Sequence, residues 1–247
     1  MYTLPKKLAA EFVGTFAFVT ACVGAVCADQ YLRANGQTAI GLLGIAIAQG
    51  VALGIMVSAI GHISGGHLNP AVTIGFWVTK RLSTFQSIAY WIAQLLGATA
   101  AAYLLAAILP ESIWRPVSLG VTDLAADFGR WPGMVLEAVM TFFLVFVVFA
   151  TAVDVKGAFN KVGGFAIGLV VTVDLLIGGA FTGGSMNPAR TFGPAIAAHH
   201  WQNHAVYWVG PLFGGVLAAA LYDRLFLTAK PPEKSEWAPR APPARLT

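Results

Sequence analysis

The sequence contains two Asn-Pro-Ala tripeptides, each preceded by a pair of glycines: His62–Thr73 reads HISGGHLNPAVT and Ala180–Thr191 reads AFTGGSMNPART. Asn is a preferred N-cap, and Pro suits the first helical turn because its missing N–H would have no partner there. Each tripeptide therefore predicts the start of a helix. The chemistry these groups offer is hydrogen-bond donation at a positive helix end. The residues of the two tripeptides are Asn69, Pro70, Ala71, Asn187, Pro188 and Ala189.

Two short helices are expected to follow the tripeptides, at Asn69–Thr79 and Asn187–Ala197. Each would rise about 16 Å, near half of a hydrocarbon core of about 30 Å, so we expect half-spans. Longer apolar segments can cross a bilayer, which takes about 20 helical residues. We predict an all-α membrane protein with six transmembrane helices, at Leu8–Ala28, Ala39–Gly61, Phe85–Leu109, Met134–Val153, Val162–Ala180 and Ala205–Leu227.

The two halves of the chain repeat each other. Tyr90-Trp91 in the third span matches Tyr207-Trp208 in the sixth. Three spans per half is an odd number, so the second half enters the membrane from the opposite side and the repeat is inverted. We expect one channel domain over residues 1–227, with repeats at about 8–109 and 134–227, and a disordered cytoplasmic tail over 228–247, which is rich in Pro and charge.

The composition indicates lipid as the solvent. The chain is 57% apolar and 11% charged, against about 25% charged residues in soluble domains. The net charge of +4 does not indicate nucleic-acid binding, because Lys and Arg lie at the ends of apolar segments. With cytoplasmic termini, only Arg33, Arg115 and Arg130 among the loop cations fall on the other side. We expect a multi-pass protein of the cell (inner) membrane.

Two half-helices that meet at mid-membrane would place roughly half a positive charge each at one point, which repels cations. The amides of Asn69 and Asn187 could also donate hydrogen bonds to a water molecule there. Cys22 and Cys27 are interpreted as small buried residues rather than as a disulfide or metal site. His199, His200 and His204 are interpreted as a solvated loop cluster, so no enzyme chemistry is predicted.

The two motifs, the second of which continues to Arg190, resemble those of the aquaporin (major intrinsic protein) family over about Leu8–Leu227. The resemblance implies a passive channel for water and small uncharged solutes, with no cofactor, and a homotetramer in lipid. Half-helix ends and an Arg are known cation barriers in such pores. The short loops suggest a bacterial or archaeal member. A secondary transporter with inverted repeats is the alternative, and Asp174 is the one unassigned intramembrane charge.

The resemblance also assigns roles to residues around the tripeptides. Glu11 and Glu137 would hold the loops by accepting backbone N–H groups. A carboxylate near a helix centre costs about 2.5–3.5 kcal/mol on insertion scales, so it needs such donors unless it reaches the interface instead. The carbonyls that would line the pore belong to Gly65, Gly66, His67, Gly183, Gly184 and Ser185.

The family's outer filter maps onto four positions counted from the two Asn residues: Gln49, Leu175, Gly184 and Arg190. Strict water channels of the family carry an aromatic and a His where this chain has Gln49 and Leu175. We therefore expect a wider filter, open to ammonia, urea, hydrogen peroxide or glycerol, unless Gln49 folds across the lumen. Thr191 and Ala195 replace the acidic and basic residues of glycerol facilitators, which favours water as the main permeant.

Three pairs of glycines spaced four residues apart predict close helix crossings, either within the bundle or between subunits. They are Gly50 and Gly54, Gly164 and Gly168, and Gly210 and Gly214.

Overall fold

The computed structural model describes residues 2–156 and 162–227, and within these ranges it is helical without strands. It contains six helices long and apolar enough to cross a membrane, which confirms the fold class predicted from the sequence. These are α1 (Leu4–Ala34), α2 (Gly41–Ser64), α4 (Thr84–Ile108), α6 (Arg130–Val148, continued by a π-helical turn at Phe149–Val153), α7 (Gly163–Thr182) and α9 (Val206–Leu225).

The first helix is longer than the predicted span Leu8–Ala28. It extends to Ala34 because Asp29 accepts a hydrogen bond from Arg33 Nε at 2.7 Å and one from Gly41 N, also at 2.7 Å. These bonds stabilise the last turns and tie α1 to the start of α2. The sequence also gave no indication of the short helix α5 (Glu111–Trp114). The predicted tail over 228–247 lies outside the described residues.

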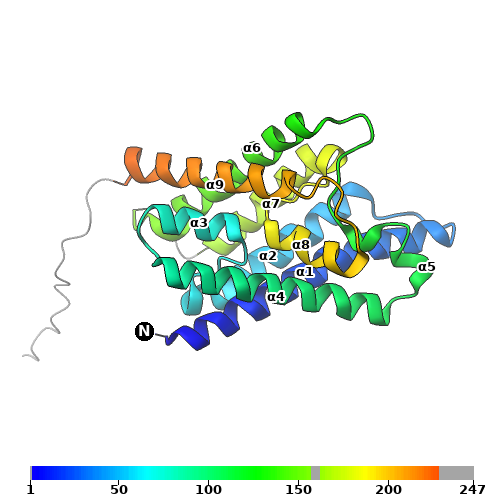
Figure 1. Cartoon of the computed structure of the whole chain (residues 1–247), viewed down its shortest axis with the longest axis horizontal. Helices are drawn as coiled ribbons and strands as arrows, with labels where there is room; N and C mark the ends of the chain where they lie inside the picture. Colours follow the sequence, from blue (N-terminus) through cyan, green and yellow to red (C-terminus); the bar gives the residue numbers. More distant parts are fainter. Residues whose placement is uncertain (1, 157–161, 228–247) are drawn as a thin grey trace, which may run out of the picture.

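The two half-helices are α3 (Pro70–Val78) and α8 (Pro188–Ala198). Each begins after an Asn whose side chain caps it: Asn69 Oδ1 accepts from Ala71 N at 2.7 Å, and Asn187 Oδ1 accepts from Ala189 N at 3.0 Å. Figure 1 shows both half-helices lying between the long helices. Local capping chemistry therefore sets where each half-helix begins.

The helices pack in pairs that follow the inverted repeat. The pair α1–α4 in the first half corresponds to α6–α9 in the second, and α2 packs against α7 across the two halves. The half-helices are exchanged between halves, since α3 packs mainly on α9 and α8 mainly on α4 (Figure 1). Each repeat thus completes the other, and neither half has its own closed core.

Small residues allow the close crossings inside the subunit. A Cβ on Gly168 would lie 2.4 Å from the carbonyl oxygen of Gly50, and one on Gly214 would lie 2.1 Å from that of Ala138. The glycine pairs therefore bring α2 against α7 and α9 against α6. Gly97 does the same for α4 and α1, with its Cβ position 2.4 Å from the carbonyl oxygen of Phe12.

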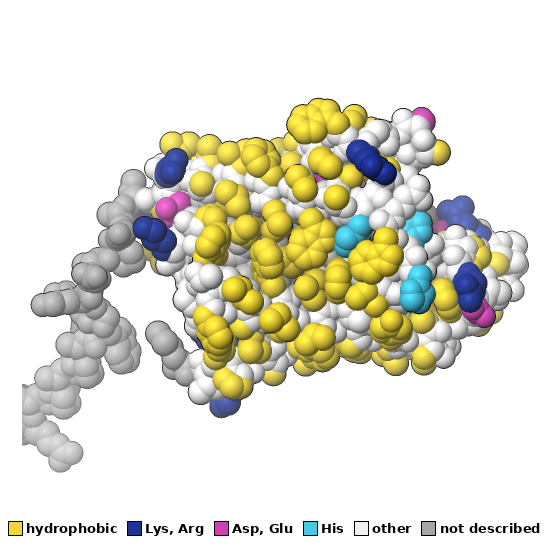
Figure 2. Space-filling model, viewed as in Figure 1, with side chains coloured by type: hydrophobic (Ala, Val, Ile, Leu, Met, Phe, Trp, Pro, Cys, Tyr) yellow, Lys and Arg dark blue, Asp and Glu magenta, His cyan; other side chains and the backbone are white. Residues whose placement is uncertain are grey.

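The outer surface is apolar around the middle of the bundle. Large side chains such as Phe85, Trp131 and Phe213 are exposed on it. Figure 2 shows hydrophobic side chains across the middle of one face, with Lys, Arg, Asp and Glu gathered toward the two ends. A bilayer would cover this band, so the chain is an integral multi-pass membrane protein.

Candidate functional site

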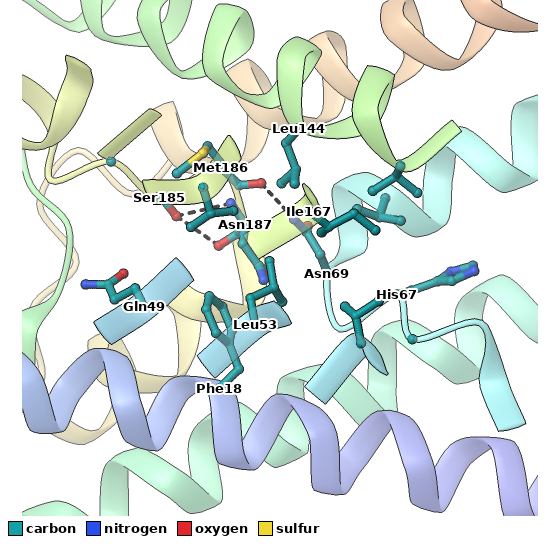
Figure 3. Close-up of a pocket in the computed structure, with 16 residues that line it drawn as sticks. Phe18, Gln49, Leu53, His67, Asn69, Leu144, Ile167, Ser185, Met186 and Asn187 are labelled. Carbon is teal, nitrogen blue, oxygen red and sulfur yellow. Dashed lines mark hydrogen bonds between the residues drawn. The ribbon is translucent and has the colours of Figure 1, made fainter. Parts of the chain in front are cut away.

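The two tripeptides meet inside the bundle through reciprocal hydrogen bonds. Asn69 Nδ2 donates to the carbonyl oxygen of Met186 at 2.9 Å (Figure 3). Asn187 Nδ2 donates to that of Leu68, also at 2.9 Å. Both Asn side chains are buried, at 2% and 3% exposure. The positive ends of α3 and α8 therefore lie beside each other between the spans.

A narrow internal cavity runs past this meeting point, with about 20 Å³ open to the centres of water molecules. One water needs about 10–15 Å³ on the same measure, so the space holds one or two waters. The polar part of the wall comes from the two loops and from Gln49 on α2, and the rest is apolar. The lining residues are Phe18, Gln49, Leu53, Val57, Gly66, His67, Asn69, Val72, Leu144, Val148, Ile167, Val171, Gly184, Ser185, Met186 and Asn187.

The loop before α3 is held by Glu11, whose side chain is fully buried. Its Oε1 accepts from His67 N at 3.0 Å and Ser64 Oγ at 2.6 Å. Its Oε2 accepts from Leu68 N at 2.7 Å and Gln94 Nε2 at 2.8 Å. Four donors compensate for the cost of burying the carboxylate, which does not reach the membrane interface.

Glu137 holds the loop before α8 in the same way and is also fully buried. Its Oε1 accepts from Thr182 Oγ1 at 2.7 Å and Ser185 N at 2.9 Å, and its Oε2 accepts from Met186 N at 2.7 Å. The two carboxylates thus fix the backbone of both loops, so that the carbonyls of Leu68 and Met186 can accept from the opposite Asn.

Two buried tyrosines complete the support, and sequence reasoning assigned them no such role. Tyr90 OH donates to the carbonyl oxygen of Ser64, and Tyr207 OH donates to that of Thr182, each at 2.8 Å. The signal that could have identified them is the repeated Tyr-Trp pair in the third and sixth spans. Gln94 was missed as well, because nothing in the sequence shows which polar residue of α4 faces Glu11.

The glycine pairs adopt left-handed backbone conformations, with φ of 98° at Gly65, 62° at Gly66, 76° at Gly183 and 60° at Gly184. Residues with a Cβ rarely adopt these values, which explains the glycines. Of the six residues expected to line the pore, Gly66, His67, Gly184 and Ser185 reach the cavity, and the other two glycines do not. His67 Nδ1 lies 3.1 Å from Thr73 Oγ1.

Of the four expected filter residues, two line the cavity and two lie outside its lining. Gln49 and Gly184 line it, and Figure 3 shows Gln49 at the end opposite His67. Leu175 packs on Gly184, where an added Cβ would lie 2.9 Å from Leu175 Cδ2. Arg190 is buried and donates from Nη1 to the carbonyl oxygen of Gly120 at 2.6 Å.

Asp174 is buried on α7 but does not line the cavity, and its Oδ2 has no hydrogen-bond partner among the described residues. Gly178 lies one turn after Asp174 on the same face of α7, and a Cβ added to Gly178 would meet Met140 of α6. The face of α7 that carries Asp174 is therefore directed toward α6. In the described ranges, no three His, Cys, Asp or Glu side chains are grouped to hold a metal ion. Cys22 and Cys27 are free thiols in the core.

This arrangement is that of an integral membrane channel in which two half-helices meet between the spans. The chain belongs to the major intrinsic protein family, whose sequence profile matches residues 2–222. Members of this family are channels and not enzymes, so the chain is a channel and not an enzyme.

Relatives of known name agree with this assignment. The chain is 47% identical to Aquaporin TIP4-4 of Zea mays over 223 residues, covering 90% of this chain and 87% of the relative. It is 44% identical to Aquaporin TIP2-1 of Arabidopsis thaliana over 222 residues, covering 88% and 86%. The prokaryotic origin suggested by the short loops finds no support, because these relatives are plant proteins.

The fold matches that of a solved structure, the aquaglyceroporin from Plasmodium falciparum. The TM-score is 0.79 with 23% sequence identity, and the match covers 91% of this chain and 98% of that one. At this identity the likeness shows the fold alone.

Proposed function

We propose that the chain is a passive water channel that also conducts ammonia, urea, hydrogen peroxide and glycerol, and that it excludes protons and ions. The observation that carries this proposal is the reciprocal pairing of Asn69 and Asn187 with the opposite loops, at 2.9 Å each, beside a narrow cavity with room for one or two waters. The name aquaporin, carried by the relatives, supports water as the main permeant.

The Asn side chains supply the proton barrier in this proposal. Each Nδ2 has two N–H groups, of which one is used on the opposite carbonyl and the other is left for the lumen. A water that accepts from Asn69 and Asn187 must turn its own hydrogens away from the midpoint, toward both mouths. This interrupts the hydrogen-bonded chain along which protons would move, and the two positive helix ends repel cations at the same place.

The filter of Gln49, Leu175, Gly184 and Arg190 accounts for the wider solute range. None of these residues is aromatic, and Gln49 Nε2 has no partner in the described part of the chain, although it is buried at the cavity wall. That amide can donate to a carbonyl or hydroxyl oxygen of a passing solute. Arg190 adds fixed donors and a positive charge that opposes cations.

Stopped-flow light scattering on proteoliposomes tests the function. We expect rapid shrinkage under an osmotic step, with low activation energy and no saturation, and slower flux of urea, glycerol, ammonia and peroxide down their gradients. A pH-sensitive dye inside the vesicles should report no proton entry under an applied potential. Saturable, ion-coupled flux would identify a secondary transporter and contradict the channel.

For topology, we propose that both termini are cytoplasmic. Lys6, Lys7, Lys80, Arg81 and Arg224 then lie on the cytoplasmic side, in agreement with the positive-inside rule. The sequence also led us to expect location in the cell (inner) membrane. The plant relatives do not support that location.

We also propose a homotetramer in lipid, with one pore in each subunit. Two exposed apolar grooves, one along α2 and α7 and one along α6 and α9, offer faces for neighbouring subunits. Native mass spectrometry of the detergent-solubilised protein should give four chains per particle, and a monomer at all detergent concentrations would contradict this.

A further inference from the structure

Residues 115–129 connect α5 to α6 and are called the α5–α6 loop. This loop lies against Arg190, one of the expected filter residues. Its Gly120 carbonyl oxygen accepts from Arg190 Nη1 at 2.6 Å. Two residues later, Thr122 Oγ1 lies 2.6 Å from Thr191 Oγ1, on the residue that follows Arg190. The loop therefore touches the filter through its own backbone and through the first turn of α8.

The position of the Arg190 side chain depends on this loop. In residues 2–156 and 162–227, the guanidinium makes one hydrogen bond, to Gly120, and its buried Nε has no partner. The side chain is nevertheless only 3% exposed. Because the guanidinium has so few protein partners, its position depends on the position of the Gly120 carbonyl oxygen that accepts from it.

Asp123 fixes the same loop from the outside. Its Oδ2 lies 2.6 Å from His200 Nε2, and its Oδ1 accepts from Asn203 Nδ2 at 2.8 Å. Asn203 Oδ1 in turn accepts from Arg130 Nε at 2.8 Å. The network joins the α5–α6 loop, the N-terminus of α6 and the loop after α8. The Asp123 carboxylate thus connects the α5–α6 loop to the loop after α8.

We propose that Asp123, with His200 and Asn203, is a positioning residue for the filter. It keeps the Gly120 carbonyl in place, and that carbonyl holds the Arg190 guanidinium against the wall of the pore. Hydrogen bonds to a carboxylate are stronger than those between neutral groups, so these contacts add to the neighbouring one between Thr122 and Thr191. The inference rests on the proposed function, since it takes Arg190 as part of the filter.

Loss of the Asp123 contacts has a predictable consequence. Once the Gly120 carbonyl moves, the buried charge of Arg190 has no partner, which is unfavourable. We expect it to take water in the lumen as its new partner. The side chain then turns into the pore and obstructs it, so water flow falls and its activation energy rises.

The main experiment compares Asp123→Ala with Asp127→Ala in proteoliposomes of equal protein content. Asp127 is an exposed carboxylate of the same loop that makes no hydrogen bond within the described residues, so it is a matched control. We expect at least a threefold loss of osmotic water permeability for Asp123→Ala and no change for Asp127→Ala. His200→Ala should resemble Asp123→Ala, whereas His200→Gln should retain flow because its amide can still donate to the carboxylate.

A second background separates positioning from general damage. If Asp123 acts through Arg190, then Asp123→Ala should have no further effect on water flow in an Arg190→Ala background. An equal loss in both backgrounds, or unchanged flow for Asp123→Ala alone, would overturn the proposal.

Hydrogen exchange tests the loop independently of flow. The backbone amides of Gly120 and Val121, which bond to Val117 and Ser118 within the loop, should exchange faster in Asp123→Ala and not in Asp127→Ala. Unchanged exchange would contradict the proposed contact. Wild-type vesicles without osmotic flow would instead contradict the proposed function, and the exchange result would still decide whether Asp123 holds the loop.

Discussion

At the residue scale, the centre of the molecule depends on a few buried polar side chains that each serve several partners. Glu137 accepts three hydrogen bonds, two of them from the backbone of the loop that carries the second tripeptide. Asn187 both caps α8 and reaches the opposite loop. Because each of these side chains serves several partners, the loss of one disturbs several contacts at once.

Glu137→Gln tests this dependence. The amide keeps the size of the side chain but turns one acceptor into a donor that faces the N–H of Ser185 or Met186. Hydrogen bonds to a charged group contribute about 1.5–3 kcal/mol each, so we expect a clear loss of stability and of water flow. Thermal unfolding in detergent measures it, with the exposed Glu111→Gln as control. Equal melting temperatures for the two variants would contradict the role of Glu137.

The filter assignment has its own test at this scale. Gln49→Phe combined with Leu175→His restores an aromatic and a His at the two positions where this chain departs from strict water channels. We expect urea and glycerol flux to fall about tenfold, equivalent to about 1.4 kcal/mol in the barrier, with water flow changed far less. Stopped-flow measurement with each solute checks this. Unchanged solute flux would show that these residues do not form the filter.

His204, in the loop before α9, makes the stability of the folded chain depend on pH. Burial lowers the pKa of this imidazole from its ordinary 6.5, and its Nε2 accepts a hydrogen bond from Trp208 Nε1 at 3.0 Å. The neutral form is therefore favoured in the folded state, and stability should be full above about pH 6.5 and decline as the pH falls below it. Melting temperatures between pH 8 and 5 should show a smaller decline for His204→Gln. An identical decline would contradict this role.

At the scale of elements, much of the fold was predictable because its signals are local. Asn69 and Asn187 cap the half-helices that follow them, and capping needs only the neighbouring residues. The six spans followed from the length of apolar sequence. The path of the α5–α6 loop and its contact with Arg190 were not predictable, because tertiary partners decide them. Of the expected filter residues, Gln49 and Leu175 followed from spacing within the family, and no motif indicated that Gly120 contacts Arg190.

Close helix crossings are the feature of the elements most open to test. Gly168→Ala would place a Cβ 2.4 Å from the carbonyl oxygen of Gly50, so α2 and α7 must move apart. Overpacking of this kind costs about 1–3 kcal/mol. Gly24→Ala is the control, since its Cβ would meet nothing within 4 Å. Thermal unfolding should separate the two variants, and a neutral Gly168→Ala would show that the crossing is not tight.

At the scale of the whole molecule, the inverted repeat explains why function needs both halves. Each half-helix packs on the third span of the other half, and each Asn donates to the other loop. The pore therefore exists only where the two halves meet. The paired motifs predicted the repeat. They did not predict that each half-helix packs on the other half, because the apolar surface of a half-helix could pack equally well on a span of its own half.

Orientation in the membrane is a property of the whole chain, and it can be measured directly. Since Cys22 and Cys27 are buried at 1% and 2% exposure, the native thiols should stay unlabelled by a membrane-impermeant maleimide. Tyr2 and Asn35 are exposed near opposite ends of α1. In intact spheroplasts of a bacterial host, the proposed topology predicts that Asn35→Cys reacts at once and Tyr2→Cys only after permeabilisation, since Lys6 and Lys7 favour a cytoplasmic N-terminus. The reverse labelling pattern would place the termini outside and the Gln49 end of the cavity toward the cytoplasm.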